Sequence, residues 1–255
     1  MANDRLPTTT ILQGRLQMYE ASKRPKTRNE TESKNKHGRC VVTGKLGQRH
    51  QDLLDSVMYH AENPERPDDL SIDIIVDPAA VRRTMAGGEN GETYSRDHIE
   101  RLIAELRSVT VKIYSNRLQS EIIGGLIDHV VKDEEVGSRP GIRRNLWKVR
   151  LGAAAVELLE QDYWLYYNPA LIAKLHYGIT QSVARWVLGQ YDNKQPKGGW
   201  YLDTVIKDNV IKDNEHEIPK RQLRKLRMKV REEAEELSEI GINLSNDRIT
   251  KAKRK

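Results

Sequence analysis

Residues 218–241 read IPKRQLRKLRMKVREEAEELSEIG, a stretch with the marks of one long helix. Pro219 suits the first helical turn, and Gly241 suits the position just past the end. Apolar residues recur at helical spacing and predict one buried stripe along the helix. They are Leu223, Leu226, Val230, Leu237 and Ile240.

The order of charges along this helix is the reverse of what helix stability favours. Seven cations and no acid stand between residues 220 and 231, whereas residues 232–239 hold five glutamates. Because the N-terminus is the positive end of the helix dipole, each misplaced exposed charge costs about 0.3–1 kcal/mol. A helix that enters the major groove of DNA by its N-terminal half needs cations there, for phosphates and guanine edges. We therefore interpret the cations as a nucleic-acid contact. The alternative is a solvated, salt-bridged helix face on which positive and negative residues happen to fall in two separate blocks. The cations are Lys220, Arg221, Arg224, Lys225, Arg227, Lys229 and Arg231.

The remaining charge is also placed unevenly along the 255 residues. Residues 1–49 carry eleven Lys or Arg and four Asp or Glu, so the rest of the chain sums to −1. Basic patches on a near-neutral body indicate an anionic polymer as partner. One cysteine excludes an intramolecular disulfide, and no run of 18 apolar residues or signal core is present. We expect a soluble cytoplasmic protein without a membrane partner.

The pattern of elements predicts two similar units. In the first, residues 48–62 are helical, 70–76 a strand, 77–86 and 95–109 helical, and 110–114, 122–131 and 146–151 strands. In the second, residues 153–160, 168–175, 181–191 and 219–240 are helical, 163–167 and 242–244 extended, and 200–206 a strand that turns into a helix. The order in each unit is that of a winged helix.

The expected fold class is therefore α+β and mostly helical, with two tandem winged-helix domains. Low hydrophobicity and high charge predict that residues 1–46 form a disordered basic arm, either a solubilising tail or a segment that tracks DNA. Residues 47–151 would be the first domain, and residues 152–255 the second, with a basic tail from residue 248. A loose turn at residues 87–93 and a charged loop at 132–145 would join elements of the first domain.

From residue 48 to residue 244 the chain resembles the iteron-binding plasmid replication initiators of the TrfA, RepA and RepE type. The strings that carry the resemblance are residues 149–159, 168–175, 180–189 and 221–241, with 74–85 and 94–113 in the first half. In that family the C-terminal winged helix supplies most sequence-specific contacts, and the N-terminal one contacts the adjacent groove or mediates dimerisation. The resemblance implies groove or phosphate contacts for Arg221, Arg224, Lys225 and Arg231, with Lys220, Arg227 and Lys229 nearby. We add Arg96 and Arg101, which lie on the helix that follows Ser95, as DNA-binding candidates in the first half.

Signals for catalysis are weak. Gly44-Lys45 lacks the first glycine of a phosphate-binding loop, and the histidines have no metal-ligand spacing. Tyr163, Tyr166 and Tyr167 are interpreted as core or interface residues, because no His-x-His pair accompanies them to hold the metal of a strand-nicking enzyme. We expect no enzyme activity, no metal and no cofactor.

The function hypothesis is a replication initiation protein that binds double-stranded DNA repeats at a plasmid origin. The resemblance implies that the protein recruits the host initiator and the replicative helicase, and that it can form a homodimer. The alternative is a winged-helix transcriptional regulator that binds an inverted repeat. A third reading, a protein-interaction module that uses the acidic half of the long helix, leaves the seven cations without a partner.

Overall fold

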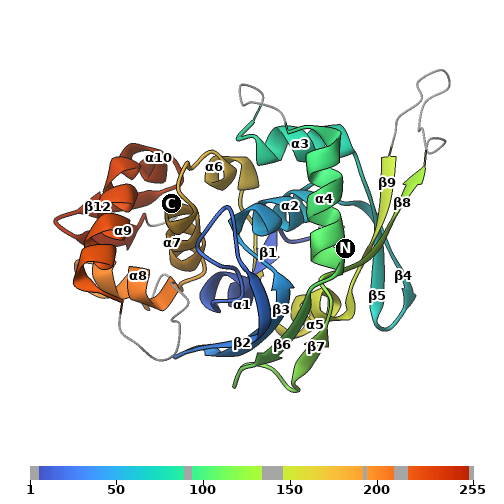
Figure 1. Cartoon of the computed structure of the whole chain (residues 1–255), viewed down its shortest axis with the longest axis horizontal. Helices are drawn as coiled ribbons and strands as arrows, with labels where there is room; N and C mark the ends of the chain where they lie inside the picture. The colour runs from blue at the N-terminus through green and yellow to red at the C-terminus, as the bar shows by residue number, and fades with distance from the viewer. Residues whose placement is uncertain (1–5, 89–93, 134–145, 192–193, 210–217, 253–255) are drawn as a thin grey trace.

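The computed structural model describes residues 6–88, 94–133, 146–191, 194–209 and 218–252 (Figure 1). The described residues form a mixed α/β fold with 41% helix and 30% strand, so the expectation of a mostly helical fold is not confirmed. The strands form four small sheets, whose orders are β1-β10, β11-β13-β12, β2-β3-β6-β7 and β4-β5-β9-β8. Figure 1 shows the last of these at one side of the molecule and α9 and α10 at the other.

The first half contains the predicted helices and strands, with capping residues where the sequence placed them. The carboxylate of Asp77 accepts from Ala79 N at 2.8 Å, and the hydroxyl of Ser95 accepts from His98 N at 3.2 Å, so each caps a helix start. The elements are α2 (Gln48–Tyr59), β5 (Ser71–Val76), α3 (Pro78–Met85), α4 (Arg96–Arg107), β6 (Thr110–Tyr114) and β9 (Leu146–Leu151). The loose turn and the charged loop lie largely outside the described residues, at 89–93 and 134–145.

The strand expected at residues 122–131 is two strands in different sheets. β7 (Ile122–Gly124) pairs with β6, whereas β8 (Ile127–Asp133) pairs with β9. The change of sheet falls at Gly124 and Gly125, where a side chain on Gly124 would approach Ala154 N to 3.0 Å. β4 (Glu62–Asp68), which the sequence did not predict, forms the exposed edge next to β5.

The predicted disorder of residues 1–46 is wrong for the described part of that segment. Residues 9–45 form β1 (Thr9–Thr10), α1 (Ile11–Arg15), β2 (Thr27–Asn35) and β3 (Gly38–Lys45). Their apolar side chains are few but buried, as with Leu12, Met18 and Val42, each 0% exposed. Arg28 is buried as well, because its guanidinium donates to the carbonyls of Met18 and Leu46 at 2.5 and 2.8 Å.

The second half follows the predicted order, with a hairpin at its end. Its helices are α5 (Ala153–Gln161), α6 (Pro169–Ala173), α7 (Gly178–Leu188), α8 (Leu202–Asn209), α9 (Lys220–Glu232) and α10 (Ala234–Glu239). Its strands are β10 (Trp164–Leu165), β11 (Trp200–Tyr201), β12 (Ile242–Ser245) and β13 (Arg248–Lys251). Residues 248–251, expected as part of a tail, form β13 and pair with both β12 and β11.

The long helix predicted at residues 218–241 is broken at Glu233. Glu233 has φ −111° and ψ 27° between α9 and α10, and it is 6% exposed. Its carboxylate accepts from the backbone N–H groups of His176 and Tyr177, the latter at 3.1 Å, and so caps the start of α7. The helix ends where a buried acid turns toward another helix. Gly241, with φ +81°, follows α10 as expected.

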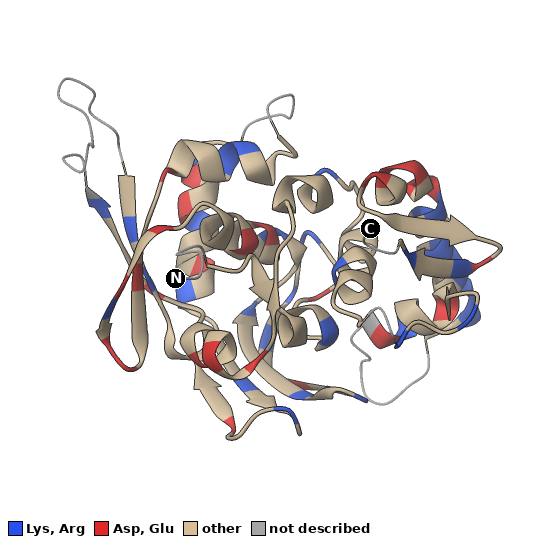
Figure 2. Cartoon of the chain, turned by 180° about the vertical axis from the view of Figure 1, so that it is seen from behind, with Lys and Arg blue, Asp and Glu red and all other residues tan. Residues whose placement is uncertain are grey.

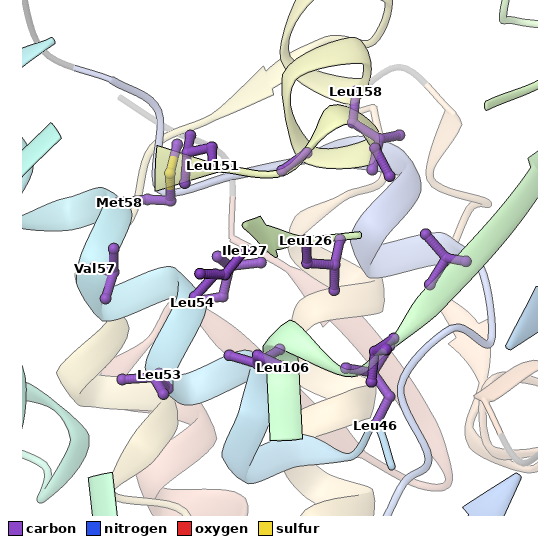
Figure 3. Close-up of a cluster of buried hydrophobic side chains, with 14 of the residues drawn as sticks. Leu46, Leu53, Leu54, Val57, Met58, Leu106, Leu126, Ile127, Leu151 and Leu158 are labelled. Atoms are coloured by element: carbon purple, nitrogen blue, oxygen red, sulfur yellow. The ribbon is translucent and has the colours of Figure 1, made fainter. Parts of the chain in front are cut away.

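Two buried apolar clusters lie in the described part of the chain. The first runs from Leu12 to Leu159, and the second from Ile172 to Ile249. Figure 3 shows part of the first, where Leu54 of α2 lies next to Ile127. The domain limits at residues 46, 151 and 152 stay a prediction, and α5 belongs to the first cluster.

A buried polar network joins the two clusters. Arg185 of α7 donates to Asp52 at 2.7 Å, to Asp55 at 2.9 Å and to Gln48 at 2.8 Å, all three on α2. The side chains of Arg185, Asp52 and Asp55 are 1%, 0% and 0% exposed. The hydroxyl of Tyr167 donates to Asp55 at 2.7 Å. Because each charge has partners, the network links α2 and α7 without leaving an isolated buried ion.

A second link is the short sheet of β1 and β10. Thr9 pairs with Leu165 and Thr10 with Trp164. The N–H of Leu12 donates to Asp162 at 2.5 Å, which ties the start of α1 to the end of α5. Among the described residues, no helix is long and apolar enough to cross a membrane.

Candidate nucleic-acid interface

α9 is amphipathic, with a narrow apolar face and a broad basic one. Leu223 and Val230 are 8% and 0% exposed and pack into the second cluster. The seven predicted cations stand at other positions of α9, so packing of Leu223 and Val230 against the core turns most of them outward. Figure 2 shows Lys and Arg along α9, and Asp and Glu along α10.

Four of the seven cations are exposed and have no side-chain partner in the part of the chain that the structure describes. The side chains of Lys220, Arg221, Arg224 and Lys225 make no hydrogen bond or ion pair with any described residue. They occupy the first two turns of α9, where the helix dipole is also positive. This end of α9 therefore presents unneutralised positive charge to an external anion.

The other three cations are held by neighbouring side chains. Nε of Arg227 lies 3.0 Å from Asp203 on α8, and Arg231 lies 2.5 Å from Asp247 in the turn between β12 and β13. Lys229 sits over the ring of Tyr177, 5.2 Å from its centroid. These contacts orient the side chains and neutralise part of their charge, so the C-terminal half of the basic face is fixed to the body.

A groove of about 690 Å³ lies along α8 and α9. Its basic lining comes from both helices and includes Lys207, which the sequence analysis did not single out. Lys207 directly follows the run 200–206, which was predicted to begin as a strand. The sequence therefore did not show that Lys207 lies on a helix next to α9. The other cations of the groove are Lys220, Arg224, Arg227 and Arg231.

Arg96 and Arg101 lie on α4, in the other half of the chain. Arg96 pairs with Glu100 at 2.8 Å, and Lys132 pairs with the same carboxylate at 2.7 Å. Arg101 donates to Nδ1 of His98 at 2.8 Å. Burial, with Arg101 and Arg49 nearby, lowers the pKa of His98, so the neutral imidazole can accept this bond. The structure thus places these two predicted residues together, but apart from the seven on α9.

The structure shows where the residues considered for catalysis lie. No cluster of three or more His, Cys, Asp or Glu that could hold a metal lies among residues 6–88, 94–133, 146–191, 194–209 and 218–252. Burial raises the pKa of Cys40 to about 12, so its thiol is protonated at neutral pH. Tyr163 and Tyr166 are 63% and 47% exposed, whereas Tyr167 is bonded to Asp55.

The fold consists of two α/β units that are joined by a buried polar network. Two solved structures have this fold. The crystal structure of RctB domains 2-3, residues 155–483 of that protein, matches with a TM-score of 0.51 and 14% identity over 88% of this chain and 82% of that one. A selenomethionine derivative of domain 2 and domain 3 of RctB matches with a TM-score of 0.52 and 13% identity over 89% and 86%. No protein-family model and no curated protein matches the chain.

Proposed function

We propose that this protein is a replication initiator that binds double-stranded DNA repeats at an origin through α9. The observation that carries the proposal is the set of four exposed cations at the start of α9, which have no side-chain partner among the described residues. The shared fold supports it, because RctB is a replication initiator. The resemblance to iteron-binding plasmid initiators supports repeats at a plasmid origin as the target.

We also propose that both halves are winged-helix units. In the first, α2, β5, α3 and α4 precede the hairpin of β8 and β9, and the sheet order is β5-β9-β8. In the second, α7, β11, α8 and α9 precede the hairpin of β12 and β13, and the sheet order is β11-β13-β12. In both, the first strand lies next to the last strand, which supports one architecture used twice. α9 then corresponds to the helix that enters the major groove.

The proposed mechanism is binding and bending, with no covalent bond made or broken. Cations at the start of α9 neutralise phosphates and release counterions, which gives a steep dependence of affinity on salt. A few arginines that reach guanine edges supply sequence specificity. Recruitment of a host initiator and helicase, and a homodimer, remain expectations from the family resemblance.

A nuclease footprint of the full chain over the replicon that encodes it, at two salt concentrations, tests the proposal. We expect protection of several direct repeats spaced by about two helical turns, roughly 21 base pairs, and weaker protection at higher salt. A single protected palindrome would instead favour the transcriptional regulator. No protection at low salt would remove DNA binding as the function.

A further inference from the structure

A second basic site lies in the first half of the chain, in a pocket to which α9 contributes no lining residue. It is a pocket of about 590 Å³ between the segment 22–26, the start of α2 and the exposed side of α4. Five cations and one acid provide its charged lining. These residues are Lys23, Arg24, Lys45, Arg49, Arg101 and Glu105.

The segment 22–26 is held rigidly where it forms this pocket. A side chain on Gly47, just before α2, would approach Ser22 O to 2.6 Å, and one on Gly178, at the start of α7, would approach Lys23 N to 3.0 Å. The segment is therefore packed between the starts of two helices from different halves. Figure 1 shows this blue loop between α2 and α7. Nζ of Lys23 donates to Leu175 O at 2.6 Å, which attaches the segment to the residues before α7.

The charges of the pocket are only partly balanced from within. Lys45 is 3.3 Å from Glu105, the one acid of the lining. Arg49 lies 3.5 Å from the buried Asp52, with its guanidinium 4.9 Å from the ring centroid of Tyr94. The other cations gain no acid: Lys23 donates to a carbonyl and Arg101 to a neutral imidazole.

Arg24 completes the set, because it is exposed and its side chain has no partner among the described residues. Guanidinium groups bind phosphate oxygens through paired, planar N–H donors. Arg24 and Arg101 thus approach the pocket from different elements with donors left for an anion. The pocket is wide enough for a phosphate group with its attached sugar.

We propose that this pocket binds a phosphate group, held chiefly by Arg24 and Arg101 and supported by Lys23, Lys45 and Arg49. The phosphate belongs either to the backbone of the DNA or to a free phosphorylated ligand. The first case rests on the proposed function. It gives the first half of the chain a contact that positions the protein on the duplex without reading sequence.

The test compares four forms of the full chain: wild type, the pocket variant Arg24→Ala with Arg101→Ala, a charge-keeping lysine variant, and a matched control, Lys34→Ala with Lys112→Ala. The control removes two cations from the β2-β3-β6-β7 sheet, outside the pocket: Lys34 is exposed, and Lys112 is half-buried and pairs with Glu30 at 3.0 Å. Two probes are used, a labelled random-sequence duplex titrated at several salt concentrations, and inorganic pyrophosphate followed by calorimetry. Arg24→Lys with Arg101→Lys, which keeps both charges, guards against loss through misfolding.

If the phosphate is that of DNA, the plot of log affinity against log salt concentration becomes less steep for the pocket variant, by about two in slope. Its affinity then falls by about tenfold or more near 0.1 M salt, while the control and the lysine variant stay close to wild type. If the phosphate belongs to a free ligand, pyrophosphate binds the wild type and the control but not the pocket variant. Equal behaviour of the pocket variant and the control with both probes would overturn the proposal.

The same experiment distinguishes failure of the pocket proposal from failure of the proposed function. If Arg224→Ala weakens duplex binding and the pocket variant changes nothing, the pocket proposal is overturned and the proposed function stands. If the wild type binds no duplex but binds pyrophosphate in the pocket, DNA binding is overturned and the pocket stands.

Discussion

Individual buried acids stabilise this fold through paired cations. Asp73 on β5 is 3% exposed and accepts two bonds from Arg150, at 2.6 and 2.9 Å, with Lys148 at 3.1 Å. The hydrogen bond from Arg150 is the main reason that the pKa of Asp73 is lowered from 3.8 to about 2. Because the folded pKa is below the unfolded one, the stabilisation is fully present above pH 4 and is lost as pH falls toward 2.

We expect Asp73→Asn to lower the free energy of unfolding by about 2 kcal/mol at pH 7, because a buried charged pair is lost. The difference from wild type should shrink between pH 4 and pH 3, where Asp73 of the unfolded wild-type chain gains a proton while the folded carboxylate is still charged. Urea unfolding at pH 7, 4 and 3 measures both effects. Asp69→Asn, at an exposed position, is the control. A difference that does not change with pH would show that the charge of Asp73 is not responsible.

A residue on α9 offers a test of recognition. Arg224→Ala should weaken binding to the cognate repeat by about 1–3 kcal/mol if Arg224 contacts a base, with a smaller loss on random duplex. Competition binding with both duplexes at one salt concentration separates the two cases, and Lys112→Ala controls for loss of one positive charge. An equal loss on both duplexes would assign Arg224 to a phosphate.

The sequence made the α9 cations predictable and the buried charges not. The cations of α9 form a run without acids, and residues that are neighbours on a helix are close in sequence. Such a run can therefore be recognised from the sequence alone. Arg28 and Glu233 look like ordinary surface charges in sequence. Their partners, Leu46, His176 and Tyr177, come from distant positions that only the folded chain brings close.

Helix boundaries were predictable where the cap is local. Asp77, Ser95 and Asn168 each cap the helix that follows directly, so sequence signals were enough. The end of α9 depends on a contact with the start of α7, which no local signal announces. The hairpin of β2 and β3 was missed for another reason: its apolar positions are few and lie within a basic composition typical of disorder.

Glu233 should therefore stabilise two helices at once. We expect Glu233→Ala to lower the free energy of unfolding by about 1–2 kcal/mol, because two N–H groups at the start of α7 lose their acceptor. Chemical denaturation measures the loss, and Glu235→Ala, an exposed neighbour on α10, is the control. Equal stability of Glu233→Ala and wild type would mean that water replaces the carboxylate fully.

At the scale of the whole molecule, the order of most elements after residue 47 was predictable, and the contacts that join the two halves were not. The pairing of β1 with β10 and the position of segment 22–26 between α2 and α7 join residues that are far apart in sequence. Separate units were the natural expectation from a repeated order of elements. The structure instead connects the two clusters through Arg185, Asp52 and Asp55.

Arg185→Met tests this connection. We expect a loss of about 3–5 kcal/mol in the free energy of unfolding, because two buried carboxylates lose their partner. Arg107→Met, at an exposed position on α4, should stay within about 0.5 kcal/mol of wild type. Denaturation followed by tryptophan fluorescence and by circular dichroism gives both values. A loss below about 1 kcal/mol would contradict a structural role for the network.

The pairing of β1 with β10 also bears on how the protein is made. The hydroxyl of Thr8 bonds to Tyr167, 159 positions later in the chain. At a synthesis rate of about 5–20 residues per second, the first strand waits about 8–30 s for its partner. During that time the N–H of Leu12 lacks its acceptor, Asp162, and the start of the first cluster is open. We therefore expect a nascent chain that ends before α5 to bind chaperones, and the first half to complete its fold only after the second has been translated.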